Sequence, residues 1–467
     1  MNVTMDKFQT DYAAVFITDG LEHLEAVKRY RKRREALAKQ YKGVIALKGL
    51  GVDLCKDKPW LMSDIPIFQE PFFLYLTGVN QLAVGFIIDN KGNHILFLPK
   101  YDMNKEFWEG KQLGYHPDSV DMLKQATGFD AIYAIDDYFS VLDKRLKTSS
   151  VTELHTMWYS SMTETGDSSQ HFFSKFKQEC KDFLKEKKYH NIQLNSIDYS
   201  DWNRLVLDDV DIDNMKKAIA ITTDALRFAC SDMSRYVNET QFAGGLRGFI
   251  HQHSWCGMSF PPIVAVGKNA LALHYVKNNS DFNRNDLLLC DVGCRYHSVV
   301  SDISRTIPVN GIFNPLQRLL YQIVLDAQLL VQEHVRSGVT FNDLNELCWN
   351  FIEAALDVRF TSIGGVMTRL YQKQPHNVGH LLAHAVHDGD PLRFYRSRPL
   401  EAGMVITNEP GLYGHFRVTI DEDVYEESIG IRIEDNLLIT ETGCVNLSEE
   451  CPKTIDDVEA MFVTSFG

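Results

Sequence analysis

The sequence predicts an α+β protein with two domains: a smaller mixed α/β domain in the N-terminal half, and a larger C-terminal domain of long helices and β-rich segments. Three observations lead to this prediction. The chain has 467 residues, which is too long for one ordinary compact core. Short helix and strand patterns alternate in the first half. The second half combines several long helical stretches with two β-rich regions.

The composition is that of a globular protein and excludes one class of partner. Hydrophobic residues make up 45% of the chain and charged residues 24%. Lys plus Arg number 48 and Asp plus Glu number 62, so the formal net charge is −14. Non-specific nucleic-acid binding needs a basic face that displaces counterions, and we therefore expect no nucleic-acid partner.

The sequence also predicts the compartment. It contains no apolar run of the length that crosses a membrane, and its first twenty residues lack the basic-then-apolar order of a signal peptide. Its nine cysteines are irregularly spaced, and the closest pair, Cys290 and Cys294, does not match zinc-finger spacing. We therefore expect a cytoplasmic protein with free thiols and no membrane partner.

The elements of the first half follow in order. Residues 22–41 have the pattern of a basic helix, and apolar segments follow at 43–52 and 72–79. Two further apolar segments are joined through Asn90–Asn93, which predicts a β-hairpin because Asn and Gly tolerate positive φ. A short strand is expected at 131–135 and a helix at 171–186.

A polar segment with weak periodicity, residues 189–209, separates the two halves and predicts domains at 1–195 and 205–467. Asp211 or Asp213 then offers the N-cap of a long helix. Further helices are expected at 315–335 and 341–356, and β-rich segments at 259–310 and 404–440.

Two aspartates occur in strand-like segments where an unpaired carboxylate would be costly. Asp291 ends an apolar run, and Asp302 lies between Val300 and Ile303. If residues 293–297 turn the chain, the two strands pair antiparallel and both carboxylates face one side, as suits a divalent cation. For either residue alone the simpler interpretation is a turn cap or an ion pair with Arg305.

Histidines are dense in the segment HNVGHLLAHAVHDGD, at positions 376, 380, 384 and 387. Histidine is a common ligand of transition metals, although such a cluster also occurs on protein surfaces. The segment lacks the HExxH motif, which disfavours a zincin-type zinc site.

Two glutamates complete the pattern. Glu409 follows an apolar run immediately before a Pro-Gly turn. In IGIRIED the apolar residues alternate with Arg432 and Glu434, so a strand would carry both charges on one face. Read alone, this segment is also compatible with a solvated face and a local Arg–Glu pair.

Taken together, these residues predict a site for two divalent metal ions. Four carboxylates balance the charge of two such ions, and without metal they would repel one another. The predicted ligands are Asp291, Asp302, His380, Glu409 and Glu434.

The same segments resemble a known family. The strings FPPIVAVGKNALALHY, DVGCRYHSVVSDISRT, HNVGHLLAHAVHD, TNEPGLY and GIRIED are similar, in order and spacing, to the motifs of the metallopeptidases that include aminopeptidase P, prolidase and methionine aminopeptidase. The resemblance implies a pita-bread fold, a curved antiparallel sheet backed by helices, and assigns the metal to the five residues above. It further implies that His274 and His387 contact substrate and the tetrahedral intermediate, and that His376 and Arg432 line the substrate pocket.

The first half resembles the companion domain of the aminopeptidase P and prolidase branch, in FFLYLTGVN and LFLPKYDMNKEFWEG. The resemblance implies hydrolysis of peptides with proline in second position, by an aminopeptidase P or, alternatively, a prolidase that requires a dipeptide. A non-catalytic binding protein with the same fold is a third reading, which the intact ligands disfavour. The resemblance also implies a homodimer or homotetramer and two ions, manganese first, with cobalt or zinc also compatible.

Mechanistically, Glu409 is expected to move a proton from water to the leaving nitrogen, while His274 or His387 donates to the oxyanion. Several positions depart from the family pattern: Val299 and Val300 replace an often aromatic segment, and Ala383-His384 stands where Gly-Leu is common. Asn377 stands where Gly is usual and Asn408 where an apolar residue is usual. We expect them to affect substrate preference and rate.

Overall fold

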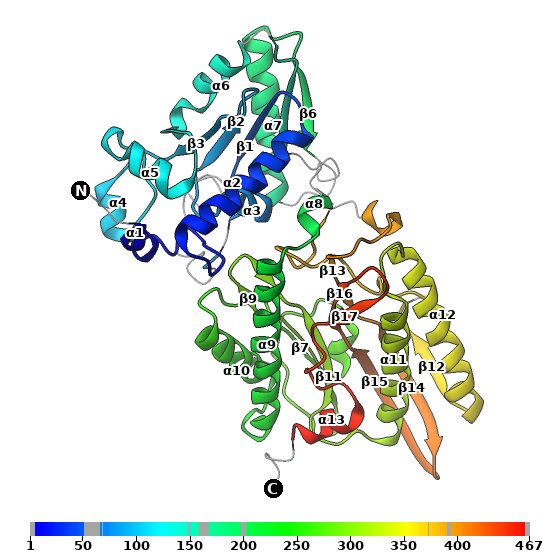
Figure 1. Ribbon diagram of the computed structural model, residues 1–467. Helices are drawn as coiled ribbons and strands as arrows, with labels where there is room; N and C mark the ends of the chain where they lie inside the picture. The colour runs from blue at the N-terminus through cyan, green and yellow to red at the C-terminus, as the bar shows by residue number, and fades with distance from the viewer. Residues whose placement is uncertain are drawn as a thin grey trace. The chain divides into compact units, whose positions relative to one another are not determined.

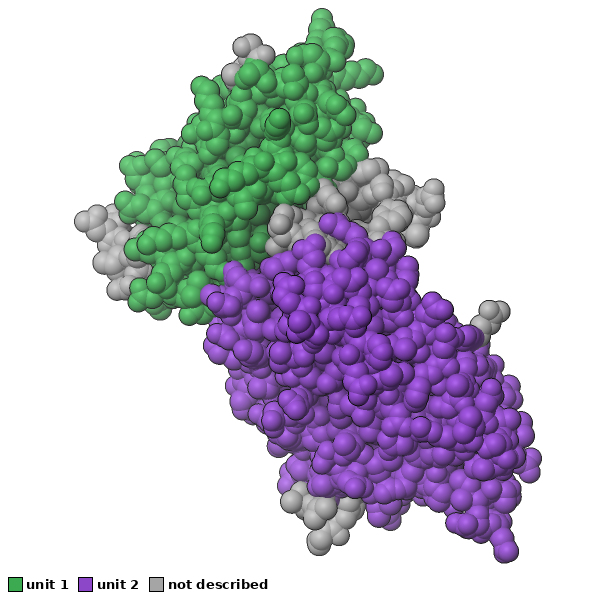
Figure 2. Space-filling view, turned by 45° about the vertical axis from the view of Figure 1, so that its right-hand side comes forward, with its two compact units in different colours: residues 1–201, 390–392 green, residues 202–389, 393–467 purple. Residues whose placement is uncertain are grey.

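The computed structural model describes residues 5–50, 66–67, 69–147, 150–157, 168–197, 202–371, 373–389 and 394–462. The chain forms two compact units, which are coloured separately in Figure 2. Unit 1 comprises residues 1–201 and 390–392, and unit 2 comprises residues 202–389 and 393–467. The division therefore falls within the polar segment 189–209, between residues 201 and 202.

Unit 1 is built on a six-stranded mixed sheet in the order β4-β3-β2-β1-β5-β6 (Figure 1). Its strands are β1 (Val44–Lys48), β2 (Gly85–Ile88), β3 (His94–Leu98), β4 (Ala131–Ala134), β5 (Glu153–Met157) and β6 (Gln193–Ile197). Its helices are α1 (Met5–Asp11), α2 (His23–Gln40), α3 (Pro71–Thr77), α4 (Met103–Glu109), α5 (Val120–Thr127), α6 (Tyr138–Leu146) and α7 (Ser168–Glu186). Strand β6 lies within the polar segment, where its weak periodicity gave no strand prediction, and residue 195 falls inside it.

Most predicted elements of unit 1 are confirmed. Helix α2 occupies the predicted segment, and β2 and β3 form the predicted hairpin, with Ile88 opposite His94. The apolar segment 72–79 contributes to helix α3, because the Glu70 side chain accepts hydrogen bonds from the backbone N–H groups of Phe72 and Phe73. Residues 51–52 of the apolar segment 43–52 lie outside the described residues.

Unit 2 is an antiparallel β structure with helices packed against it. Its strands are β7 (Ile263–Val266), β8 (Leu287–Val292), β9 (Arg295–Tyr296), β10 (Val299–Val300), β11 (Ile303–Pro308), β12 (Val366–Arg369), β13 (Val405–Asn408), β14 (Gly411–Ile420), β15 (Asp423–Arg432), β16 (Asp435–Ile439) and β17 (Cys444–Asn446). Its helices are α8 (Trp202–Leu205), α9 (Asp209–Ser231), α10 (Glu239–His253), α11 (Pro315–His334), α12 (Phe341–Arg359) and α13 (Ile455–Ala460). The described strand pairs of this unit are antiparallel.

The helices of unit 2 cover these strands at two sides. Helix α10 packs on β7 and α9 on β9 and β10, while α11 packs on β14 and β15 (Figure 1). This arrangement confirms the expected antiparallel sheet backed by helices. Among the described residues, no helix is both long enough and apolar enough to cross a membrane.

The start of α9 differs from the prediction. The N-cap is Asp208, whose side chain accepts a hydrogen bond from the backbone N–H of Asp211 at 3.0 Å. Asp211 and Asp213 therefore lie inside the helix. Several acids in this short segment can each cap a helix, and the sequence pattern alone did not distinguish them.

A long hairpin in unit 2 is interrupted at one level on both strands. Strands β13 and β16 pair up to Asn408 opposite Asp435, and strands β14 and β15 pair from Gly411 opposite Arg432. Between these pairs lie residues 409–410 and 433–434, where both strands pass from one three-stranded sheet to another. The two predicted glutamate ligands occur in this interruption.

Candidate active site

The predicted site residues line one cavity in unit 2, with a volume of about 150 Å³. The predicted residues around it are His274, Asp291, Asp302, His376, His380, His387, Glu409, Arg432 and Glu434. The remaining lining residues are Leu273, Asn377, Gly379, Tyr395 and Arg396. Residues more than 150 positions apart in the sequence therefore meet at one place.

Asp291 lies in β8, and Asp302 immediately precedes β11, the strand paired with β8. Asp291 lies opposite Ser304 in the register, so Asp302, two residues earlier, lies on the same face. The tight turn of this hairpin lies at His297, where φ is 52°, because β9 and β10 continue the pairing beyond β8. Oδ1 of Asp291 and of Asp302 are both buried without a hydrogen-bond partner among the described residues.

His380 is held by Thr407 of β13. Its N–H donates to Thr407 Oγ1 at 3.0 Å, and its carbonyl accepts from the Thr407 N–H at 2.9 Å. Gly379 permits this close approach, because a Cβ there would collide with the Thr407 carbonyl oxygen. His380 Nδ1 lies 3.1 Å from the Leu381 carbonyl oxygen, so that contact assigns the proton to Nδ1 and leaves Nε2 free to bind a cation.

The acidic groups converge on His380 Nε2. This atom lies 3.5 Å from Asp302 Oδ2 and 3.5 Å from Glu409 Oε1. Ligand atoms of Asp302, His380 and Glu434 lie within 4.8 Å of one another. Glu434 also accepts a hydrogen bond from Ser304 Oγ at 2.7 Å.

The buried carboxylates repel one another electrostatically when no cation is bound. Burial, together with the charges of Asp291 and Glu409, raises the pKa of Asp302 well above its usual range. Burial also raises the pKa of Glu409, and burial with the charge of Asp302 raises that of Glu434. Arg432 compensates part of this charge through an ion pair with Asp291 at 2.6 Å. Buried oxygens without donors and raised pKa values are what a divalent cation would relieve, so this ligand set fits one.

His387 lies beside His380, with 4.5 Å between ring centroids, and 6.3 Å from the His274 ring. The next residue, Asp388, fixes its loop: it accepts backbone hydrogen bonds from His384 and Gly389 at 3.0 and 2.7 Å. Arg204 of α8 forms a fully buried ion pair with Asp388, with one contact of 2.8 Å. Both groups thereby orient the loop that carries His387.

His376 lies at an aromatic wall of the cavity. Its Nε2 is 3.0 Å from Tyr413 Oη, and its ring meets Trp349 edge-on at 5.4 Å. Burial, reinforced by the charge of Arg432, lowers the pKa of His376 to about 3. A neutral imidazole at this wall can accept or donate a hydrogen bond without adding charge.

Asn377 and Asn408, which depart from the family pattern, have different surroundings. Asn377 faces the cavity, and its side-chain oxygen can accept a hydrogen bond from Arg396 Nη1 at 3.1 Å. Asn408 is buried, and its amide donates to the Gln328 carbonyl at 2.8 Å, away from the cavity. Asn377 can therefore contact a ligand directly, whereas Asn408 can act only through packing.

Two simpler interpretations from the sequence are wrong. Arg305 pairs with Asp435 rather than with either aspartate of the hairpin, and Arg432 pairs with Asp291 rather than with Glu434. Period-2 alternation after Asp302 also places Ser304 on the cavity face, a signal that could have identified it. Tyr413 and Asp388 gave no such signal, because their side-chain partners His376 and Arg204 are 37 and 184 positions away.

The chain is similar over most of its length to known proteins. Residues 213–441 match the model described as metallopeptidase family M24, and residues 30–155 match the aminopeptidase P N-terminal domain. The Xaa-Pro aminopeptidase of Haemophilus influenzae is 31% identical over 84% of this chain and 88% of its own length. Human Xaa-Pro aminopeptidase 3 is 28% identical over 95% of this chain and 86% of its own. The structure of Escherichia coli aminopeptidase P with the inhibitor Pro-Leu has a TM-score of 0.76 at 26% identity, covering 94% of this chain and 98% of that one.

Proposed function

The chain belongs to the aminopeptidase P family of metallopeptidases, and from this membership we propose that it hydrolyses the bond between an N-terminal residue and a following proline. The relatives named Xaa-Pro aminopeptidase cover nearly its whole length. The observation that carries the proposal is the cavity of unit 2, where four carboxylates, one imidazole, and the predicted substrate-contacting side chains meet.

Divalent metal ions are the cofactor of this family. We propose two ions, held by Asp291, Asp302, His380, Glu409 and Glu434. Four carboxylates and one imidazole form an oxygen-rich set that suits manganese, and cobalt or zinc are also compatible with it. A zinc-substituted form of the Escherichia coli relative has been solved with product.

When bound, such ions supply an activated water and polarise the scissile carbonyl. The chain's own residues do the rest. Glu409 lies 3.5 Å from His380 Nε2 and is the group proposed to take the proton of the water and pass it to the leaving proline nitrogen. His387 and His274 donate hydrogen bonds to the developing oxyanion.

The pocket is proposed to accept proline against the aromatic wall at His376. His376 and Arg432 line it, and both lie against Tyr413, at 3.0 and 3.4 Å. The amide before proline has no N–H, so a wall that asks for no donor from it accepts the substrate. Asn377 lines the cavity and is proposed to affect substrate preference.

The remaining assignments are also proposals. We place the protein in the cytoplasm as a homodimer or homotetramer, with units 1 and 2 as its two domains. No disulfide joins the described cysteines, which is compatible with a reducing compartment; Cys55 lies outside the described residues.

Hydrolysis of two peptides by metal-stripped protein, with and without added manganese, tests the proposal. Manganese-dependent release of the first residue from Xaa-Pro-Yaa-Yaa is the expected result. Cleavage of Xaa-Pro alone would instead make the enzyme a prolidase. Absence of cleavage of both peptides with manganese, cobalt and zinc would refute the proposed activity.

A further inference from the structure

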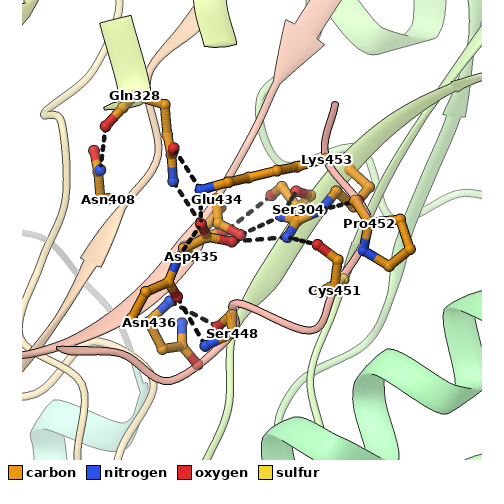
Figure 3. A network of polar contacts seen from close by, with 12 residues as sticks. Ser304, Gln328, Asn408, Glu434, Asp435, Asn436, Ser448, Cys451, Pro452 and Lys453 are labelled. Carbon is orange, nitrogen blue, oxygen red and sulfur yellow. Dashed lines mark hydrogen bonds and ion pairs between the residues drawn. The ribbon is translucent and has the colours of Figure 1, made fainter. Parts of the chain in front are cut away.

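A buried network of polar groups surrounds Asp435, the residue that follows Glu434 (Figure 3). Its centre is the ion pair of Arg305 and Asp435, whose side chains are 1% and 0% exposed, with 2.7 Å between Nη2 and Oδ1. Asp435 follows Glu434 in the sequence, so one residue faces the cavity and the next faces the network.

All three nitrogens of the Arg305 guanidinium group donate hydrogen bonds within this network. Nη1 donates to the carbonyl oxygens of Ser304 at 2.9 Å and Glu434 at 2.6 Å. Nη2 and Nε donate to the carbonyl oxygens of Cys451 and Pro452, at 3.0 and 2.7 Å. The planar fork of arginine thus joins three separate chain segments, a geometry that lysine cannot reproduce.

Ser304 carries the connection to the cavity. Its hydroxyl donates to Glu434 Oε2 at 2.7 Å and accepts from Arg432 Nε at 2.8 Å. Its carbonyl also accepts the Glu434 N–H at 3.0 Å. Backbone and carboxylate of Glu434 are therefore both attached to a residue that Arg305 holds.

Such support matters at this position because ordinary strand pairing is interrupted there. Glu434 lies between β15 and β16, outside both ladders. A metal ligand must be held within about 0.5 Å of its productive position, and neighbouring hydrogen bonds supply that restraint.

We propose that Arg305 is a positioning residue for Glu434: with Asp435 as its counter-ion, it fixes Ser304 and the backbone of Glu434 so that the Glu434 carboxylate is presented to the metal. This inference rests on the proposed role of Glu434 as a metal ligand. It assigns to Arg305 an effect on metal affinity, beyond the stability that any buried ion pair affects.

Lys453 provides a matched control within the same network. Its Nζ contacts Asp435 Oδ2 at 2.6 Å and Gln328 Oε1 at 3.0 Å (Figure 3). Among the described residues, its Nζ bonds to Gln328, Gln332 and Asp435, and not to Ser304 or Glu434. Lys453→Met therefore removes the positive charge beside Asp435. It leaves the contacts of Arg305 with Ser304 and Glu434 in place.

The experiment is calorimetric titration of the metal-stripped full-length protein with Mn²⁺, alongside thermal unfolding without metal. Arg305→Lys is expected to weaken Mn²⁺ binding about 10–100-fold, the scale of groups that orient metal ligands. The Kd of Lys453→Met for Mn²⁺ should stay within about threefold of that of the unaltered protein, even if its unfolding temperature falls as much as that of Arg305→Lys. Equal losses of affinity in the two variants, or unaltered affinity in Arg305→Lys, would overturn the proposal.

Ser304→Ala keeps the test decisive if Arg305→Lys does not fold. This small change removes the hydroxyl between Arg432 and Glu434, and it should also weaken Mn²⁺ binding; unaltered affinity would overturn the proposal. Glu434→Ala separates the premise from the inference. If it binds Mn²⁺ as tightly as the unaltered protein, the ligand assignment itself fails, and the inference with it.

Discussion

Each unit of the molecule buries ionisable groups whose pKa values shift because of burial, but the groups compared differ in kind. In unit 1 they are basic: burial lowers the pKa of Arg34 to about 9 and that of His94 to about 4. In unit 2 they are acidic, and burial raises the pKa values of Asp302, Glu409 and Glu434.

The partners of these groups explain why one cluster is structural and the other suits a ligand. Arg34 donates to the carbonyl oxygens of Leu76 and Gly128, both at 2.9 Å, and lies 3.9 Å from the centre of the Phe129 ring. These neutral groups close around it. The carboxylates of unit 2 instead line an open cavity, so an external cation can supply the missing charge. A buried charge without compensation therefore indicates a binding site only where a cavity adjoins it.

The largest expected effect comes from removing the acidic charge. Asp302→Ala and Glu409→Ala should each lower kcat by about 1,000-fold or more, the scale expected when one member of a catalytic unit is lost. The measurement is hydrolysis of an Xaa-Pro-Yaa-Yaa peptide with saturating manganese, with circular dichroism as the check on folding. Glu441→Ala, an exposed acid of the same unit, is the control. Full activity in either site variant would remove the basis of the comparison.

Removing the metal should destabilise unit 2 and leave the stability of unit 1 unaltered. Metal at 100 times its Kd stabilises the folded state by about 3 kcal/mol, so chelation should lower the melting temperature of unit 2 by roughly 5–10 °C. Hydrogen exchange can localise the effect: amides of β8, β11 and β16 should lose protection, whereas those of β1, β2 and β3 should not. Equal loss of protection in both sheets would show that the carboxylate cluster is not the local source of the instability.

Acid should have a smaller effect, and in unit 1 the group responsible is His94. The pKa of His94 is about 4 in the folded chain and about 6.5 when unfolded, so the unfolded state binds more protons between these values. This contribution to stability is complete above pH 6.5 and is lost as pH falls towards 4. At pH 5 the loss reaches up to about 2 kcal/mol.

Urea unfolding of unit 1 at pH 7 and pH 5, followed by hydrogen exchange of β3, measures this loss. His94→Gln should reduce the pH dependence, and His190→Gln, at an exposed histidine of the same unit, should not. If His94→Gln left the pH dependence unaltered, burial of His94 would not be its source.

Local patterns were sufficient to predict much of the site. Alternation in IGIRIED places Arg432 and Glu434 on one face, and both are buried at the cavity. The pairings of Arg305 with Asp435 and of Arg204 with Asp388 could not be predicted, because they join residues 130 and 184 positions apart. From a single sequence one can predict that a buried charge needs a partner, but not which residue that partner is.

The interrupted hairpin constrains how this chain can change its length. Glu409 and Glu434 flank two paired strands of ten residues each, β14 and β15, which meet at a turn containing Asp421 and Glu422, both with positive φ. Deleting one residue from one strand would shift its register and rotate one glutamate to the opposite face. Residues added at the turn, or removed in equal pairs from both strands, would leave both glutamates in place. Length variation is therefore free at the tip of this hairpin and forbidden along either arm alone.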